Sequence, residues 1–147
     1  MATLTEALFW FSSLYILPFW LMMWFFPKHE KTEQMLSNEW IFLAPLLVSY
    51  SLAVTPHLPN LLLTLASDMP TPALVIDLFS DDEIILVGWL HYLAFDLLAG
   101  RWTWRRLMAA EKPIYISCPI LILSMMVAPF GCLLGLLITG TSDLAIE

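Results

Sequence analysis

The chain has 147 residues, of which 60% are apolar, 14% aromatic and only 13% charged. A soluble domain carries about 45–50% apolar and about 25% charged residues, so this composition excludes an ordinary soluble domain. It also excludes a disordered chain, which needs low hydrophobicity and many charges. The net charge of −7 argues against a nucleic-acid partner, because such a partner requires a basic face. The length suits one domain over residues 1–147.

Hydrophobic stretches predict an all-α polytopic membrane protein with four transmembrane helices, at about residues 4–26, 40–56, 84–104 and 114–139. The first contains the uncharged stretch Ala7–Phe26, which matches the roughly 20 residues needed to cross a bilayer. Pro18 lies inside this stretch and predicts a kink, since proline removes a backbone donor.

The second hydrophobic stretch is interrupted by prolines, so its spanning part is predicted as Trp40–Val54. Thr55 precedes a proline and should end or kink this helix. Leu58–Leu65 then forms either a continuation or an interfacial helix. The whole segment 57–83 is predicted as an interfacial loop, in which Ala73–Phe79 is too short to span and is expected at the membrane surface.

The last two hydrophobic stretches are Ile84–Trp102 and Ile114–Ile138, the second of which carries Pro119 and Pro129. These prolines predict a bent fourth transmembrane helix. Small residues repeat along it, with glycines at positions 131 and 135 forming a GxxxG pair. This pair predicts a close helix contact within the bundle, because glycine lets two backbones approach.

Basic residues predict the orientation in the membrane. All six Lys and Arg residues lie in the loops 28–39 and 101–113. The positive-inside rule makes that side cytoplasmic, or stromal in a photosynthetic organelle. With four spanning helices, both termini are expected on the outer side, which is the periplasm or the lumen.

Asp96 is the first candidate catalytic residue, because a carboxyl inside a membrane helix is costly and indicates function. A carboxyl that burial keeps neutral can act as a general acid. Tyr92 is the second candidate, since its spacing of four residues from Asp96 places both on one helix face, with Gly88 and Gly100. The alternative is structural: Asp96 bonds to another helix or to an arginine, and the glycines allow a close helix crossing.

His91 and Arg101 are candidate cofactor-binding residues. A neutral imidazole in the membrane can ligate the magnesium of a chlorophyll-type pigment, although a hydrogen bond to a neighbouring helix is the alternative. Arg101 belongs to a basic cluster that either binds anionic lipid or a partner, or only signals orientation. No metal site is expected, because the three histidines are scattered and the two cysteines form no CxxC motif.

A longer motif carries a family resemblance. The third hydrophobic stretch contains Gly88-Trp89-x-His91-Tyr92-Leu93-Ala94-Phe95-Asp96-Leu97-x-x-Gly100-Arg101-Trp102. This motif resembles the plant neoxanthin-deficient (abscisic-acid-deficient) membrane-protein family, which has cyanobacterial and other bacterial relatives. Pro129-Phe130-Gly131 and the Leu-rich run after it resemble a second motif of that family.

The resemblance implies a role in converting the epoxy-carotenoid violaxanthin to the allenic neoxanthin, in a thylakoid or bacterial inner or intracytoplasmic membrane. Two hypotheses follow. In the first, the chain is a xanthophyll epoxide isomerase or a carotenoid-binding protein, a redox-neutral role that requires no cofactor. In the second, it is a non-catalytic accessory subunit of a photosynthetic pigment–protein complex, where it packs against membrane lipid, other transmembrane subunits and carotenoid or chlorophyll-type pigments.

Overall fold

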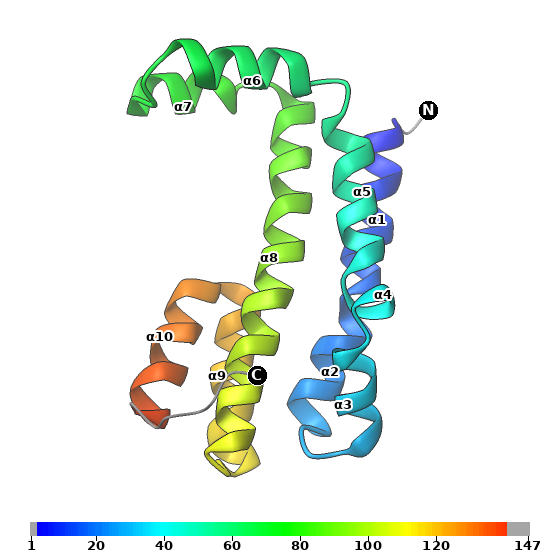
Figure 1. The fold of residues 1–147 in the computed structure, drawn as a ribbon, viewed down its shortest axis with the longest axis vertical. Helices are drawn as coiled ribbons and strands as arrows, with labels where there is room; N and C mark the ends of the chain where they lie inside the picture. The colour runs from blue at the N-terminus through cyan, green and yellow to red at the C-terminus, as the bar shows by residue number, and fades with distance from the viewer. Residues whose placement is uncertain (1–2, 141–147) are drawn as a thin grey trace.

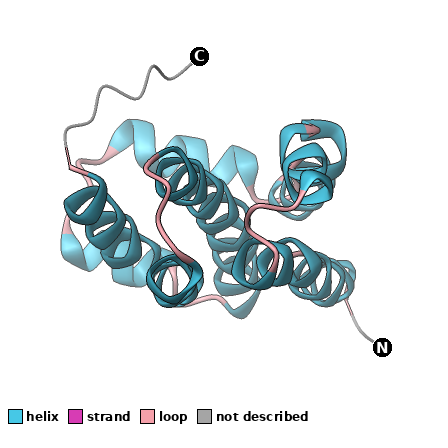
Figure 2. Cartoon of the chain, turned by 90° about the horizontal axis from the view of Figure 1, so that it is seen from below, coloured by secondary structure: helices cyan, strands magenta, loops and turns pink. Residues whose placement is uncertain are grey.

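The computed structural model describes residues 3–140, and in this range the chain forms helices joined by short turns (Figures 1 and 2). The prediction of an all-α fold is confirmed. In chain order the helices are α1 (Leu4–Tyr15), α2 (Leu17–Phe25), α3 (Glu30–Ser37), α4 (Glu39–Phe42), α5 (Ala44–Val54), α6 (Leu58–Ser67), α7 (Pro72–Leu78), α8 (Asp82–Ala109), α9 (Ile114–Met126) and α10 (Ala128–Thr139).

Two helical segments of the described chain are long and apolar enough to cross a membrane, and the pair α5 and α6 makes a third if it counts as one broken span. The first segment, Leu4–Phe25, consists of α1 and α2. Its helix is interrupted at Ile16, and Pro18 lies in the first turn of α2, where its missing N–H costs least. The helix is thus interrupted at Ile16, just before Pro18, while Leu4–Phe25 still counts as one span.

The second segment, α8, is a single helix of 28 residues. It begins at a side-chain cap, because the Asp81 Oδ1 atom accepts hydrogen bonds from the backbone N–H groups of Glu83 and Ile84.

A sharp bend separates α5 from α6. The two helix axes differ by 80° across the break that contains Thr55 and Pro56. As Figure 1 shows, α6 and α7 lie across one end of α8 instead of extending α5. Neither α6 nor α7 has a buried residue. Two roles were predicted for Leu58–Leu65. The structure contradicts one of them, a straight continuation of the preceding helix.

The fourth hydrophobic stretch does not form one bent spanning helix, and that prediction is wrong. The chain reverses at Val127 (φ −147°, ψ 75°), so that α9 and α10 form a helical hairpin beside one half of α8 (Figure 1). A Cβ atom added at Gly131 would lie 2.4 Å from the backbone N of Ser124, so only glycine allows this approach. Pro129 lies in the first turn of α10, where proline starts a new helix instead of bending an old one.

The hairpin also changes the expected position of the carboxyl-terminal part. The Arg106 guanidinium donates hydrogen bonds to the Thr139 hydroxyl (3.0 Å) and to the Gly140 carbonyl (2.9 Å). Gly140 therefore lies at the same end of α8 as the basic loops, and not at the opposite end as four spanning helices require. The carboxyl terminus itself lies outside the described residues.

The main hydrophobic core lies in the half of the molecule that contains α9. Trp20, Phe42 and Leu97 are almost fully buried in one cluster that joins α2, α4, α5, α8 and α9. A smaller cluster, which includes Val54 and Leu90, holds α5 against the other half of α8. We call the end that carries α6, α7 and the start of α8 the acidic end, and the end that carries α3 and the last turns of α8 the basic end.

Candidate functional site

A cavity of about 320 Å³ lies at the acidic end, between α5, α6, α8 and the residues that end α7. Most of its lining is apolar. Its polar groups come from four side chains: Tyr50, His57, His91 and Tyr92. A largely apolar cavity with a few converging polar groups is the usual form of a small-molecule site, and we call it the acidic-end pocket.

The bend after α5 and one glycine shape this pocket. The bend places His57 above the pocket, while α5 itself contributes Tyr50. On the opposite side, the Phe79 ring lies against Gly88 of α8, where an added Cβ atom would be 2.9 Å from the ring. Gly88 thus lets the end of α7 close over the pocket, as the motif of small residues in α8 suggests.

His57 lies against a carboxylate at the edge of the pocket. Its Nε2 atom lies 3.2 Å from the Glu83 Oε2 atom. The cap of α8 at Asp81 fixes the helical turn that carries Glu83. No sequence pattern reveals this pair, because its partners are on separate elements that meet only through the 80° bend.

Two of the predicted site residues, His91 and Tyr92, line the acidic-end pocket. The His91 ring packs edge-on against Tyr50, with centroids 5.5 Å apart, and stacks on Phe95 at 4.6 Å. Within residues 3–140, no hydrogen bond to the His91 side chain is present, so the alternative of a bond to a neighbouring helix has no partner there. Tyr92 is exposed over 62% of its surface and forms part of the pocket rim.

Asp96, the predicted general acid, lies one turn beyond Tyr92 on the same face of α8 and does not line the pocket. Its side chain is half-buried and has no hydrogen bond or ion pair with any residue in the described range. The structural alternative, in which Asp96 bonds to another helix or to an arginine of the chain, therefore finds no partner among these residues.

Arg101, the fourth predicted site residue, lies at the basic end. Its guanidinium donates hydrogen bonds to the Leu36 carbonyl at 3.0 Å and to the Glu39 carboxylate at 3.3 Å. It also lies 4.8 Å from the centre of the Phe42 ring. These contacts tie α8 to α3 and α4, so the structure does not bring Arg101 together with the acidic-end pocket.

The sequence predicts no metal site. Within the part of the chain that the structure describes, no three His, Cys, Asp or Glu side chains gather in a way that could hold a metal ion. No curated protein and no solved structure matches the chain.

One protein family does match, the family described as ABA DEFICIENT 4-like, over residues 7–134. This range includes α8 with its glycine, histidine and aspartate motif, the pocket and most of the hairpin. The chain therefore belongs to the ABA4-like family, as the motif in its third hydrophobic stretch indicated.

Proposed function

We propose that the chain is a membrane protein that binds a xanthophyll and isomerises its epoxide. The observation that carries this proposal is the acidic-end pocket, where His57, His91 and two tyrosines surround an otherwise apolar cavity. A volume of about 320 Å³ suits the cyclic end group of a carotenoid, with its polyene outside, along the exposed rings of Tyr92 and Phe95. Membership of the ABA4-like family supports this substrate class.

The chemistry of such an isomerisation needs proton transfer only. An acid gives a proton to the epoxide oxygen, the C–O bond breaks, and a proton leaves the neighbouring chain carbon as the allene forms. Atoms and electrons balance without a redox cofactor. An imidazole held against a carboxylate can donate and recover a proton, so we assign the acid role to His57 in its pair with Glu83.

Tyr92 orients the substrate at the rim of the pocket in this proposal. Asp96 is the competing acid, because it lies one turn away on the same face and has no partner in the described range. His91, which stacks on Phe95, would contact the polyene or a second pigment.

The proposal includes an orientation of the chain in the membrane. The positive-inside rule places the basic end in the cytoplasm or stroma, so that the amino terminus and the acidic-end pocket lie at the outer surface. The hairpin then leaves Gly140 on the inner side, where it bonds to Arg106. A thylakoid or bacterial inner membrane is the expected location.

The test is conversion of an epoxy-xanthophyll in a pigment-producing host. His57→Gln and Glu83→Gln should each lower turnover by about 10²- to 10⁴-fold if the pair supplies the proton. Asp82→Asn is the matched control, since Asp82 lies in the same turn as Glu83 but forms no ion pair with His57. Full conversion by His57→Gln would refute the assignment of the acid.

A second function is favoured by one observation, the unpartnered Asp96 beside exposed aromatic rings in the middle of α8. A carboxyl within a membrane is normally paired, so another transmembrane subunit could supply the missing donor. In that case the chain is an accessory subunit of a pigment–protein complex. Stable copurification of such a complex, lost in Asp96→Leu, would support this role over the catalytic one.

A further inference from the structure

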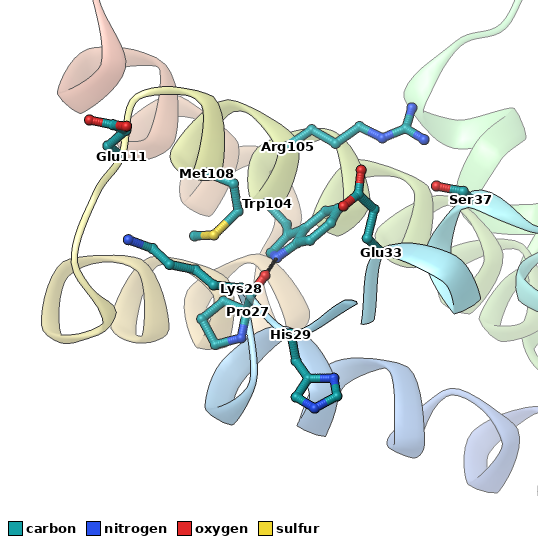
Figure 3. A pocket seen from close by; sticks show the side chains of 9 residues that line it. All are labelled: Pro27, Lys28, His29, Glu33, Ser37, Trp104, Arg105, Met108 and Glu111. Carbon is teal, nitrogen blue, oxygen red and sulfur yellow. Dashed lines mark hydrogen bonds between the residues drawn. The ribbon is translucent and has the colours of Figure 1, made fainter. Parts of the chain in front are cut away.

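The cavities at the two ends of the molecule differ in how their polar groups are satisfied. A cavity of about 520 Å³ lies at the basic end, between the turn after α2, α3 and the last turns of α8. Its buried Trp104 indole donates a hydrogen bond of 3.0 Å to the Pro27 carbonyl, as Figure 3 shows. Its charged side chains are exposed, where water can satisfy them: Lys28, Glu33, Arg105 and Glu111. The polar groups of this cavity are therefore satisfied without a ligand.

Tyr50, in the acidic-end pocket, is in a different situation. Of the four tyrosines in the chain, Tyr15 and Tyr50 are half-buried. The Tyr15 hydroxyl donates a hydrogen bond to the Ile41 carbonyl. The Tyr50 hydroxyl lines the pocket but has no hydrogen bond with any residue in the range 3–140. A tyrosine hydroxyl that is withdrawn from water normally finds a partner, so an unpaired one beside a cavity points to a ligand.

The Tyr50 ring is held in place by its neighbours. It packs against the smaller core cluster, which joins α5 to α8. The His91 ring meets it edge-on, with centroids 5.5 Å apart, and no hydrogen bond joins the two side chains. The Tyr50 oxygen is not enclosed by protein, unlike the unpaired hydroxyl oxygen of Ser12. The pocket therefore contains a fixed phenol whose hydroxyl a bound molecule can reach.

We propose that the Tyr50 hydroxyl binds a hydroxyl group on the cyclic end group of the xanthophyll, an inference that rests on the proposed function. In that function His57 gives its proton to the epoxide oxygen of the same ring. Tyr50 comes from α5 and His57 from the bend that follows it, so the pocket presents two separate polar positions. A ring that carries both an epoxide and a hydroxyl satisfies both. Tyr50 thus selects the ligand and takes no part in the proton transfer.

This role makes the pocket selective against rings that lack a hydroxyl. An epoxy-carotene without ring hydroxyls has nearly the same shape, but it would leave the Tyr50 hydroxyl unpaired in a largely apolar cavity. A site that hydrogen-bonds a ligand hydroxyl discriminates against the analogue without it, because the polar group of the site then has no partner. One neutral hydrogen bond of this kind corresponds to about a tenfold difference in binding.

Competition between two pigments tests this proposal. The full chain in detergent is offered equal amounts of an epoxy-xanthophyll and of the matching epoxy-carotene without ring hydroxyls, and the retained pigments are measured. Wild type should retain the hydroxylated pigment with about tenfold preference. Tyr50→Phe keeps the ring and its contacts, so it should fold as wild type does and retain the two pigments equally. It should also raise KM for the epoxy-xanthophyll and leave kcat near that of wild type, whereas loss of the acid lowers kcat.

Tyr115→Phe is the matched control. It makes the same change at a tyrosine of α9 that is 76% exposed and does not line the pocket, so the preference should persist. Equal retention of the two pigments by wild type, or an unchanged preference in Tyr50→Phe, would overturn the role of Tyr50 and leave the proposed function in place. Retention of neither pigment by wild type would overturn the proposed function, and this inference with it.

Discussion

Trp20 lies directly against Gly100, and the indole ring occupies the space that any side chain at position 100 would need. A Cβ atom added there would be 2.2 Å from the Trp20 Cη2 atom. Trp20 itself is only 1% exposed and belongs to the main core cluster, so its ring has little room to move. This contact holds α2 against α8 and explains the glycine at the end of the α8 motif without a functional role.

Gly100→Ala should therefore destabilise the protein by about 1–3 kcal/mol, the usual cost of overpacking a tight core. Thermal melting in detergent measures this loss. Gly88→Ala is the matched control on the same helix, since its Cβ atom would meet only the edge of the Phe79 ring, which can shift. Equal melting temperatures for the two variants would contradict the special role of the Trp20 contact.

Gly131 permits the hairpin in the same way, because it lies against the Ser124 backbone. Gly131→Ala should lower the melting temperature by an amount that corresponds to about 1–3 kcal/mol, since a backbone cannot move aside as a flexible side chain can. Leu133→Ala, at a half-exposed position of α10, should change the melt little. A wild-type melt for Gly131→Ala would mean that α9 and α10 do not pack as described.

Side-specific labelling tests the orientation. In a background with Cys118 and Cys132 replaced by serine, a cysteine at Asp77 should react with an impermeant thiol reagent from outside. Cysteines at Lys31 and Gly140 should react only after the membrane is opened. Labelling of position 140 from outside would show that the fourth hydrophobic stretch spans the membrane. Reversed labelling of positions 31 and 77 would show that the chain has the opposite orientation.

Substitutions of Asp96 distinguish three cases: His57 is the acid, Asp96 is the acid, or Asp96 forms a structural bond. If His57 is the acid, Asp96→Asn should keep xanthophyll conversion close to that of wild type, whereas a catalytic Asp96 predicts a loss of about 10²- to 10⁴-fold. Since Asp96 has no partner within residues 3–140, Asp96→Leu should not lower the melting temperature of the isolated chain. A lower melt would reveal an internal bond that the structure lacks.

The fold was predictable where local chemistry decides it. Apolar composition indicates helices long enough to cross a membrane, and the first of them is interrupted at Ile16, two residues before Pro18. The hairpin was not predictable, because its apolar pattern is the same as that of a spanning helix. Pro119 lies inside α9 without ending it, whereas Pro129 begins α10. Tertiary contacts decide between the two, such as the approach of Gly131 to Ser124 and the bonds of Arg106 to Thr139 and Gly140.

The candidate site was predictable in the same limited sense. Helical spacing correctly places Tyr92 and Asp96 on one face of α8, but it does not show where a cavity opens along that face. Likewise, the basic cluster that contains Arg101 suggests a ligand, although the bonds of Arg101 go to Leu36 and Glu39. The pair of His57 and Glu83 depends on the bend after α5, whose angle no local pattern sets.

The separation of charge between the two ends has a consequence in an energised membrane. The acidic end carries Asp68, Asp77, Asp81, Asp82 and Glu83, while all Lys and Arg residues lie at the basic end, where they outnumber the carboxylates Glu30, Glu33, Glu39 and Glu111. With the orientation proposed above, a voltage that is negative inside attracts the basic end and repels the acidic one. Each charge that would have to cross on inversion adds about 2.3 kcal/mol per 100 mV. A membrane voltage that is negative inside thus favours the proposed orientation over the inverted one.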